Sequence, residues 1–77
     1  MKNVYIIVGE RFTQEEVKRE LKEEGYPYNF YFPRTDDFEE RRFHMEVADE
    51  IWTFGDVSKI DDYQVAKTDG KDVWVMG

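Results

Sequence analysis

Apolar residues in this chain gather in short runs that charged stretches separate. Residues 4–8 are continuously apolar and rich in β-branched side chains, and the run stops at Gly9. A run that does not alternate predicts a strand covered on both faces, as in a parallel sheet. The aromatic run 28–32 also favours a strand, and the apolar residues 51–54 and 73–76 predict two more, over about 51–54 and 72–76.

The polar stretches between these runs have helical signals. Thr13 and Glu16 have the three-residue spacing of a capping box, and Gly25 suits the left-handed position after a helix. We therefore predict a helix over residues 14–24. A shorter helix is predicted over residues 61–68, so strands and helices alternate along the chain.

The segment 37–48 has two possible interpretations. Thr35 or Asp36 could cap a helix there, but residues 43–47 alternate apolar and polar side chains with the period of a strand. With the helix, the chain is one α/β domain, residues 1–77, with a small open, mostly parallel four-stranded sheet. With the strand, the fold is α+β. We prefer the helix, for a reason that comes from a family resemblance below.

The acidic residues are concentrated in the middle of the chain. The net charge is −7, and the segment 36–62 has ten acidic and three basic residues, which makes 3 − 10 = −7 on its own. Such a segment repels nucleic acid and attracts basic protein surfaces, although excess acid also favours solubility. The candidate partner-binding residues are its ten carboxylates: Asp36, Asp37, Glu39, Glu40, Glu46, Asp49, Glu50, Asp56, Asp61 and Asp62.

Composition limits the chemistry further. There is no cysteine and only one histidine, His44, so we predict neither a transition-metal site nor any cofactor. No apolar run reaches the roughly 20 residues of a membrane span, and no signal peptide is recognisable. We therefore expect no membrane association and a cytoplasmic location.

The segment 48–56, with Ser58 after it, resembles the third-strand motif of small nucleoside 2-deoxyribosyltransferase-like proteins. The resemblance continues through Ala66, Gly70 and Lys71, which have the Ala-x-x-x-Gly-Lys spacing of that family. These proteins are Rossmann-like domains, and short phage and bacterial proteins are among them. The resemblance implies an α/β fold and a helix leading into the motif.

The resemblance also implies a ligand site. Asp62 stands where active members have a carboxylate, while Asp56 and Ser58 fall in the loop that contacts the sugar or base. Two departures argue against catalysis. Lys59 follows the serine where the family usually has a small residue, and Glu10 in the first-strand loop would repel a phosphate.

Two functions from different classes follow. The first is a small acidic, non-catalytic interaction protein that occupies a basic, nucleic-acid-binding surface of another protein as a DNA mimic, like small phage-encoded inhibitors. The alternative is a nucleotide- or nucleoside-binding domain with a degenerate site at Asp56, Ser58 and Asp62. We prefer the first. Trp74, on the last strand at the expected sheet edge, would in addition anchor a homodimer.

Overall fold

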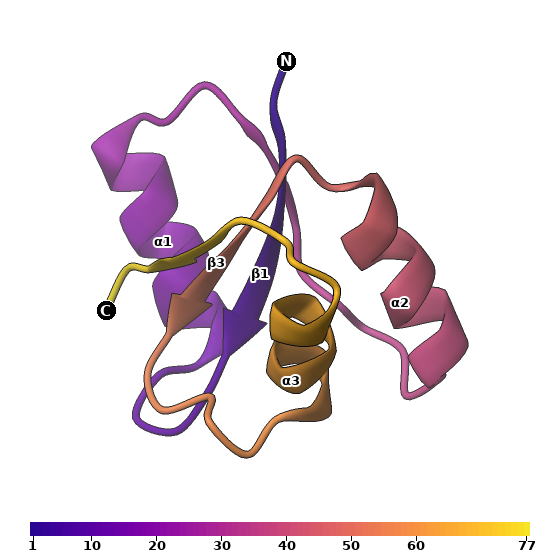
Figure 1. Cartoon of the computed structure of the whole chain (residues 1–77). Helices are drawn as coiled ribbons and strands as arrows, with labels where there is room; N and C mark the ends of the chain where they lie inside the picture. The colour runs from indigo at the N-terminus through magenta and orange to yellow at the C-terminus, as the bar shows by residue number, and fades with distance from the viewer.

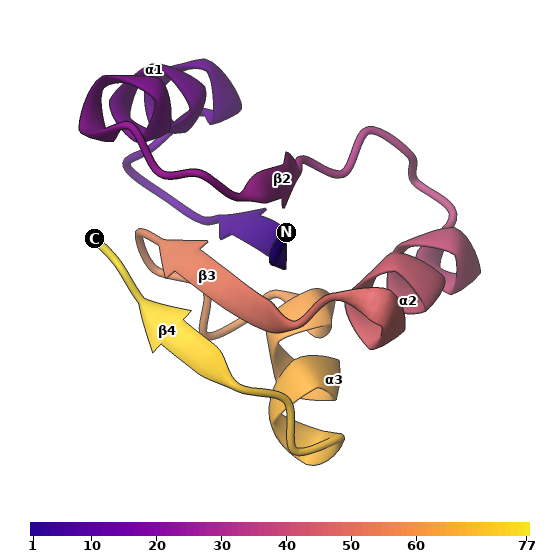
Figure 2. The ribbon, with the colours of Figure 1, turned by 90° about the horizontal axis from the view of Figure 1, so that it is seen from above.

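A four-stranded sheet with helices on both faces makes up the computed structural model, which describes residues 1–77 (Figures 1 and 2). The elements in chain order are β1 (Asn3–Val8), α1 (Gln14–Glu24), β2 (Asn29–Tyr31), α2 (Phe38–Val47), β3 (Glu50–Phe54), α3 (Asp61–Thr68) and β4 (Val73–Val75). The strand order is β2-β1-β3-β4, and all three pairings are parallel. The predicted small α/β fold is confirmed.

The core lies on the two faces of the central strands β1 and β3. On one face, Val4 and Ile6 of β1 pack with Trp52 of β3 beneath α1. On the other face, Tyr5 and Ile51 pack against α2 and α3. Figure 2 shows these layers, with α1 on one side of the sheet and α2 and α3 on the other. Covering on both faces explains why neither strand alternates in sequence.

The ends of α1 follow the predicted capping signals. The Thr13 hydroxyl accepts a hydrogen bond from the Glu16 amide at 3.2 Å, and the Glu16 carboxylate accepts one from the Thr13 amide at 2.9 Å. Gly25 ends the helix in the left-handed conformation, with φ of 73°. Local side-chain chemistry therefore determines both boundaries.

Residues 43–47 belong to α2, so the alternative α+β fold is wrong. The cap is Asp37, whose carboxylate accepts from the Glu39 amide at 3.0 Å, rather than Thr35 or Asp36. Only Met45 of the helix is fully buried, and Phe43 and Val47 are more than half exposed. The period-two pattern misleads because these two apolar side chains face solvent.

The outer strands β2 and β4 have three residues each, shorter than the predicted runs 28–32 and 72–76. They form the two edges of the sheet, and Trp74 lies on an edge as expected. No helix in the structure has the length and apolar character needed to cross a membrane.

Candidate functional site

The loops after β1 and β3 meet at the point where a ligand site would be expected. The chain moves outward in opposite directions from β1 and β3, and open α/β sheets bind ligands beyond the carboxyl ends of two such strands. Here the two loops pair with each other (Figure 1). The Gly9 amide donates to the Phe54 carbonyl at 2.7 Å, and the Glu10 amide donates to the Asp56 carbonyl at 3.3 Å.

Two glycines make this close pairing possible. A Cβ atom on Gly9 would overlap the carbonyl oxygen of Asp56, and one on Gly55 would overlap that of Glu10. The loops therefore leave no space between them for a phosphate. A hollow of about 400 Å³ lies beside them, and its charged lining side chains are Glu10, Asp56 and Lys59.

Asp56 and Ser58 are engaged with each other in the β3–α3 loop. Asp56 Oδ1 accepts from the Ser58 hydroxyl at 2.8 Å and from the Ser58 amide at 3.1 Å. These hydrogen bonds lower the pKa of the Asp56 carboxyl below its ordinary value. The arrangement is an Asx turn, in which an aspartate stabilises the backbone that follows it.

Asp62 lies away from this loop, buried in the first turn of α3 against the sheet face that α2 and α3 cover. Its Oδ2 accepts from the Tyr5 hydroxyl at 2.7 Å, and both carboxylate oxygens lie 3.1 Å from Nε of Arg41. Burial, followed by the hydrogen bond to Asp62, raises the pKa of Tyr5. The network joins β1, α2 and α3, and its carboxylate is not accessible to a substrate. Asp62 therefore does not converge with Asp56 and Ser58 on one pocket.

Glu50 is the second buried carboxylate of the acidic segment. It accepts from Nε1 of Trp52 at 2.8 Å and from Nζ of Lys2 at 3.3 Å. The hydrogen bond to Glu50 raises the pKa of the Lys2 ammonium. Glu50 and Asp62 were predicted to bind a partner, but both are buried and paired within the chain. The partner-binding set is corrected by removing them.

Six of the remaining eight carboxylates lie at one end of the molecule. Each helix starts where the preceding strand has ended, so α2 and α3 both begin at the carboxyl edge of the sheet (Figure 1). Carboxylates there also stabilise the positive ends of the helix dipoles. We call these six exposed residues the acidic end: Asp36, Asp37, Glu39, Glu40, Asp56 and Asp61.

Glu46 and Asp49 do not belong to the acidic end, because they lie at the carboxyl end of α2 and just after it. In the two stretches that form the acidic end, 36–40 and 56–61, the one basic residue is Lys59. The formal charge of these two stretches is therefore 1 − 6 = −5, and the charges of Glu10 and Arg11 in the adjoining β1 loop cancel.

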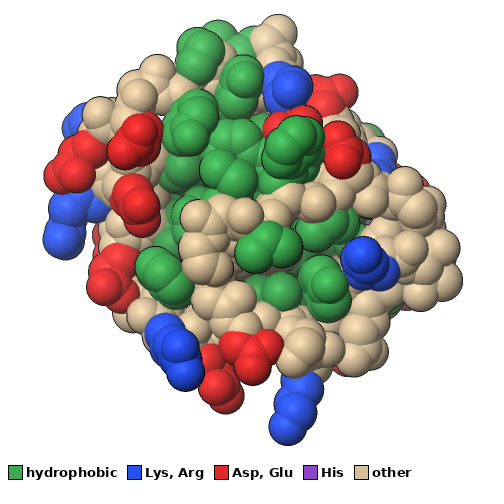
Figure 3. Space-filling model, turned by 60° about the vertical axis from the view of Figure 1, so that its left-hand side comes forward, with side chains coloured by type: hydrophobic (Ala, Val, Ile, Leu, Met, Phe, Trp, Pro, Cys, Tyr) green, Lys and Arg blue, Asp and Glu red, His purple; other side chains and the backbone are tan.

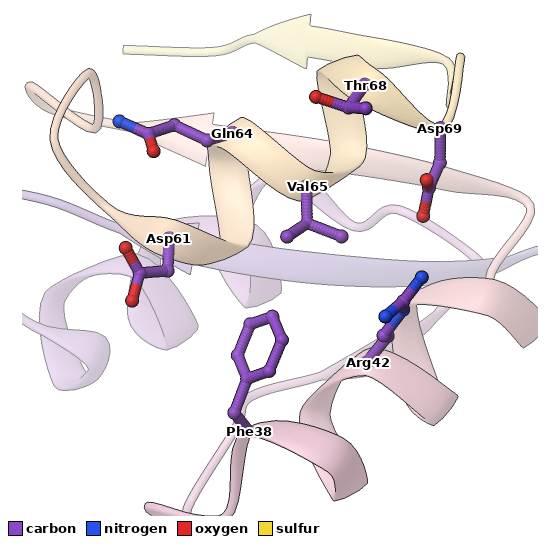
Figure 4. Close-up of a pocket in the computed structure, with 7 residues that line it drawn as sticks. All are labelled: Phe38, Arg42, Asp61, Gln64, Val65, Thr68 and Asp69. Carbon is purple, nitrogen blue, oxygen red and sulfur yellow. The ribbon is translucent and has the colours of Figure 1, made fainter.

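A groove between α2 and α3 adjoins the acidic end (Figure 4). Its volume is about 320 Å³. Figure 4 shows Phe38 of α2 and Val65 of α3 directed toward each other across the groove, with Asp61 on one side. Arg42 and Asp69 lie on the other side. The groove therefore has two facing apolar side chains, and its other five lining residues are polar or charged: Arg42, Asp61, Gln64, Thr68 and Asp69.

No cluster of three His, Cys, Asp or Glu side chains is arranged to hold a metal ion. His44 is half-buried on α2 and stacks on the Tyr31 ring, with 4.0 Å between ring centroids. The Ser58 hydroxyl donates to Asp56 rather than to an imidazole. Ser58 therefore has no imidazole as its hydrogen-bond partner.

Sequence reasoning missed the partners of the buried carboxylates and the role of Lys71. The Lys71 ammonium donates to the carbonyl oxygens of Glu46 at 2.7 Å and Ala48 at 2.9 Å, so it caps the carboxyl end of α2. A basic residue 23 positions after a helix end has no local signal of this role. Arg41 likewise looks like one of a surface pair until the fold places it against Asp62.

Comparisons with protein-family models, with curated proteins and with solved structures found no match to this chain. The acidic end and the adjoining groove are its candidate site.

Proposed function

We propose that this chain is a small acidic, non-catalytic interaction protein that binds a basic surface of another protein. The observation that carries the proposal is the placement of six exposed carboxylates at one end, next to a groove in which Phe38 and Val65 face each other. Asp62, the candidate carboxylate of the alternative function, is instead buried and paired with Tyr5 and Arg41. Binding, rather than catalysis, is the function that these contacts support.

The Asp61 side of the groove suits a long basic side chain, because the cation of Arg42 lies on the other side, near Asp69. Phe38 and Val65 offer apolar surface to the methylene stem of a lysine or arginine, and Asp61 offers a carboxylate to its cationic end. The Phe38 ring already attracts a cation, since the Arg41 guanidinium lies 5.5 Å from its centroid. The other carboxylates of the acidic end would contact neighbouring cations.

A surface rich in lysine and arginine is typical of proteins that bind nucleic acid. The acidic end would compete for such a surface by presenting negative charge in place of phosphates. The chain would then act as an inhibitor and DNA mimic, in the manner of small phage-encoded proteins, and would itself bind no nucleic acid. Charge-driven binding of this kind weakens steeply with added salt.

The alternative, a nucleotide- or nucleoside-binding domain, has less support. Asp62 is paired with Tyr5 and Arg41 behind the sheet, and Asp56 is paired with Ser58. The hollow beside the paired loops has two carboxylates, which disfavour a phosphate. Titration with nucleosides and nucleotides tests it through amide chemical shifts. Changes confined to residues 9–12 and 55–62 would support this alternative, and no response at millimolar ligand would exclude it.

The proposed function is tested by titrating the protein with a purified basic nucleoid protein and measuring the dissociation constant at several salt concentrations. Duplex DNA is the competitor. The test needs two variants with equal net charge. The acidic-end variant is Glu39→Gln, Glu40→Gln and Asp61→Asn, and the control variant is Glu23→Gln, Glu24→Gln and Asp72→Asn.

The wild-type protein should bind at low salt and release its partner to DNA. The acidic-end variant should bind at least tenfold more weakly and with a smaller salt dependence, because three charge contacts are gone. The control variant should bind within about twofold of wild type, because its substitutions lie away from the acidic end. Equal loss in both variants, or no binding at low salt, would contradict the proposal.

A further inference from the structure

The outer side of β4 has no partner strand. The Ile51 amide donates to the Asp72 carbonyl at 2.9 Å, and the Met76 amide donates to the Thr53 carbonyl at 2.9 Å. Trp74 stands opposite Trp52 in this parallel ladder. Alternate residues bond to a neighbouring strand, so the amide and carbonyl groups of Val73 and Val75 point away from β3. The edge therefore presents two free donors and two free acceptors.

This edge also carries exposed apolar side chains. Val75 is 77% exposed, Trp74 is 50% exposed and Met76 is 36% exposed. Figure 3 shows hydrophobic side chains gathered over this side of the molecule, with charged side chains mostly around the margin. Residues 73–76 include no charge and no proline, the usual devices that block an edge strand. An apolar patch with a charged margin is typical of an interaction surface.

Trp74 is exposed because its face of the sheet has a single helix, whereas Val75, like Val73, projects from the opposite face. The side chains of α1 that reach the core, Val17 and Leu21, cover β1 and β3 from that face. Trp74 faces the same side as Trp52 and is half exposed, and Figure 2 shows that α1 does not extend over β4. The fold therefore leaves this part of the sheet unfinished.

We propose that β4 pairs with β4 of a second copy of the chain. The two strands run antiparallel about a two-fold axis and join the two sheets into one of eight strands. Trp74 lies opposite Trp74 of the second copy, and Val73 lies opposite its Val75. In this register the outward groups of both valines exchange hydrogen bonds, four in all, and the two tryptophan side chains meet on one face.

Symmetry favours a second copy as the occupant, and the geometry limits the repulsion between two acidic chains. A two-fold interface needs a surface that is complementary to itself, and this register uses every outward group of Val73 and Val75 in both copies. Antiparallel pairing also places the two acidic ends at opposite ends of the dimer. Although each chain has a charge of −7, the densest carboxylates of the two copies therefore stay far apart.

The size of the patch predicts a weak dimer. An aromatic side chain buries about 150–250 Å², so half of Trp74 offers on the order of 100 Å², and Val75 offers a similar area. The two copies together would bury less than the roughly 1,200–2,000 Å² of a stable interface. Dimer formation should therefore depend on concentration.

Sedimentation equilibrium tests the proposal over concentrations from about 10 μM to 1 mM. The mass should rise from 9.3 kDa toward twice that value. Val75→Pro should remain monomeric, because it removes an outward amide and leaves the β3 ladder intact. Val75→Thr keeps the amide and should dimerise within about threefold of wild type, while Val75→Lys should be monomeric even if the proline variant unfolds. A wild-type protein that is monomeric at 1 mM would overturn the proposal. Dimerisation that neither Val75→Pro nor Val75→Lys weakens would also overturn it.

The register has its own test, because the chain contains no cysteine. In Trp74→Cys the two thiols would be directly opposite, with Cα atoms about 4.5 Å apart, which a disulfide can bridge. In Val75→Cys the Cα atoms would be about 8–9 Å apart, which is too far. The first variant should cross-link at least tenfold faster than the second under mild oxidation. Equal rates, or a faster second variant, would overturn this register.

This inference does not depend on the acidic end. The acidic-end variant should dimerise like the wild type, and Val75→Lys should still bind the basic nucleoid protein through its acidic end. Failure of one proposal therefore leaves the other standing.

Discussion

Removing the Asp62 carboxylate should destabilise the protein far more than removing its exposed neighbour. In Asp62→Ala, the Tyr5 hydroxyl and the Arg41 Nε both lose their acceptor. Breaking a buried ion pair in this way costs about 3–5 kcal/mol. The Asp62 side chain is 7% exposed and the Arg41 side chain 20% exposed, so water reaches the guanidinium and the lower figure, about 3 kcal/mol, applies.

This loss is large for a chain of 77 residues, whose total stability is expected to be about 4–12 kcal/mol. Urea unfolding followed by far-UV circular dichroism measures it. With a slope of about 1 kcal/mol per molar, typical of a small domain, the midpoint should fall by about 3 M. The control Asp61→Ala should lower the midpoint by less than about 1 M, because that carboxylate is exposed and stabilises only the start of α3.

Further variants separate the unpaired charge from lost packing. Tyr5→Phe should cost about 1.5–3 kcal/mol, because Asp62 keeps its bond to Arg41. The triple variant Tyr5→Phe, Arg41→Met and Asp62→Leu should regain most of the stability that Asp62→Ala loses, since no buried polar group of this network is left unpaired. A midpoint for Asp62→Ala within 1 M of wild type would refute the reasoning. A triple variant no more stable than Asp62→Ala would refute it as well.

Three other perturbations follow from the structure. Burial raises the pKa of Tyr5, so the folded state favours the neutral phenol. Stability should therefore fall as the pH rises above about 10, the ordinary tyrosine pKa. Absorbance at 295 nm should show one tyrosine that ionises only on unfolding. Lys71→Met should cost about 1 kcal/mol in urea unfolding and speed amide exchange in the last turn of α2, whereas the exposed Lys67→Met should stay within about 0.5 kcal/mol of wild type. Gly55→Ala should cost about 2–4 kcal/mol of stability, because the residue has a positive φ and its Cβ would meet the Glu10 carbonyl. Gly25→Ala has a positive φ but open space, so it should cost about 1 kcal/mol. Equal costs would contradict the loop pairing.

The two proposed surfaces have a joint consequence. In the antiparallel dimer the acidic ends point in opposite directions, so one assembly could bind two basic surfaces at once. On an array of partners, such as proteins bound along nucleic acid, two weak contacts would act together. The monomeric Val75→Lys variant should then bind a single partner normally and an array more weakly.

Much of the fold follows from local patterns in the sequence. The capping box at Thr13, the left-handed Gly25 and the continuous apolar run 4–8 act over a few residues, and the structure reproduces the elements they predict. The segment 37–48 is ambiguous in the sequence, because its alternation fits a strand while its capping residues fit a helix. In the structure, Met45 packs in the core and Lys71, from far along the chain, caps the end of the helix. These tertiary contacts stabilise the helix.

The candidate site depended on distance in space. The sequence alone determined the number of carboxylates, their concentration in one segment and the alternation of strands and helices. Only the tertiary structure decided that Glu50 and Asp62 are buried beside Trp52 and Tyr5, and that six other carboxylates share one end. Burial and pairing depend on partners far away in the chain, 57 positions for Tyr5 and Asp62, and a local pattern of charge contains no record of them.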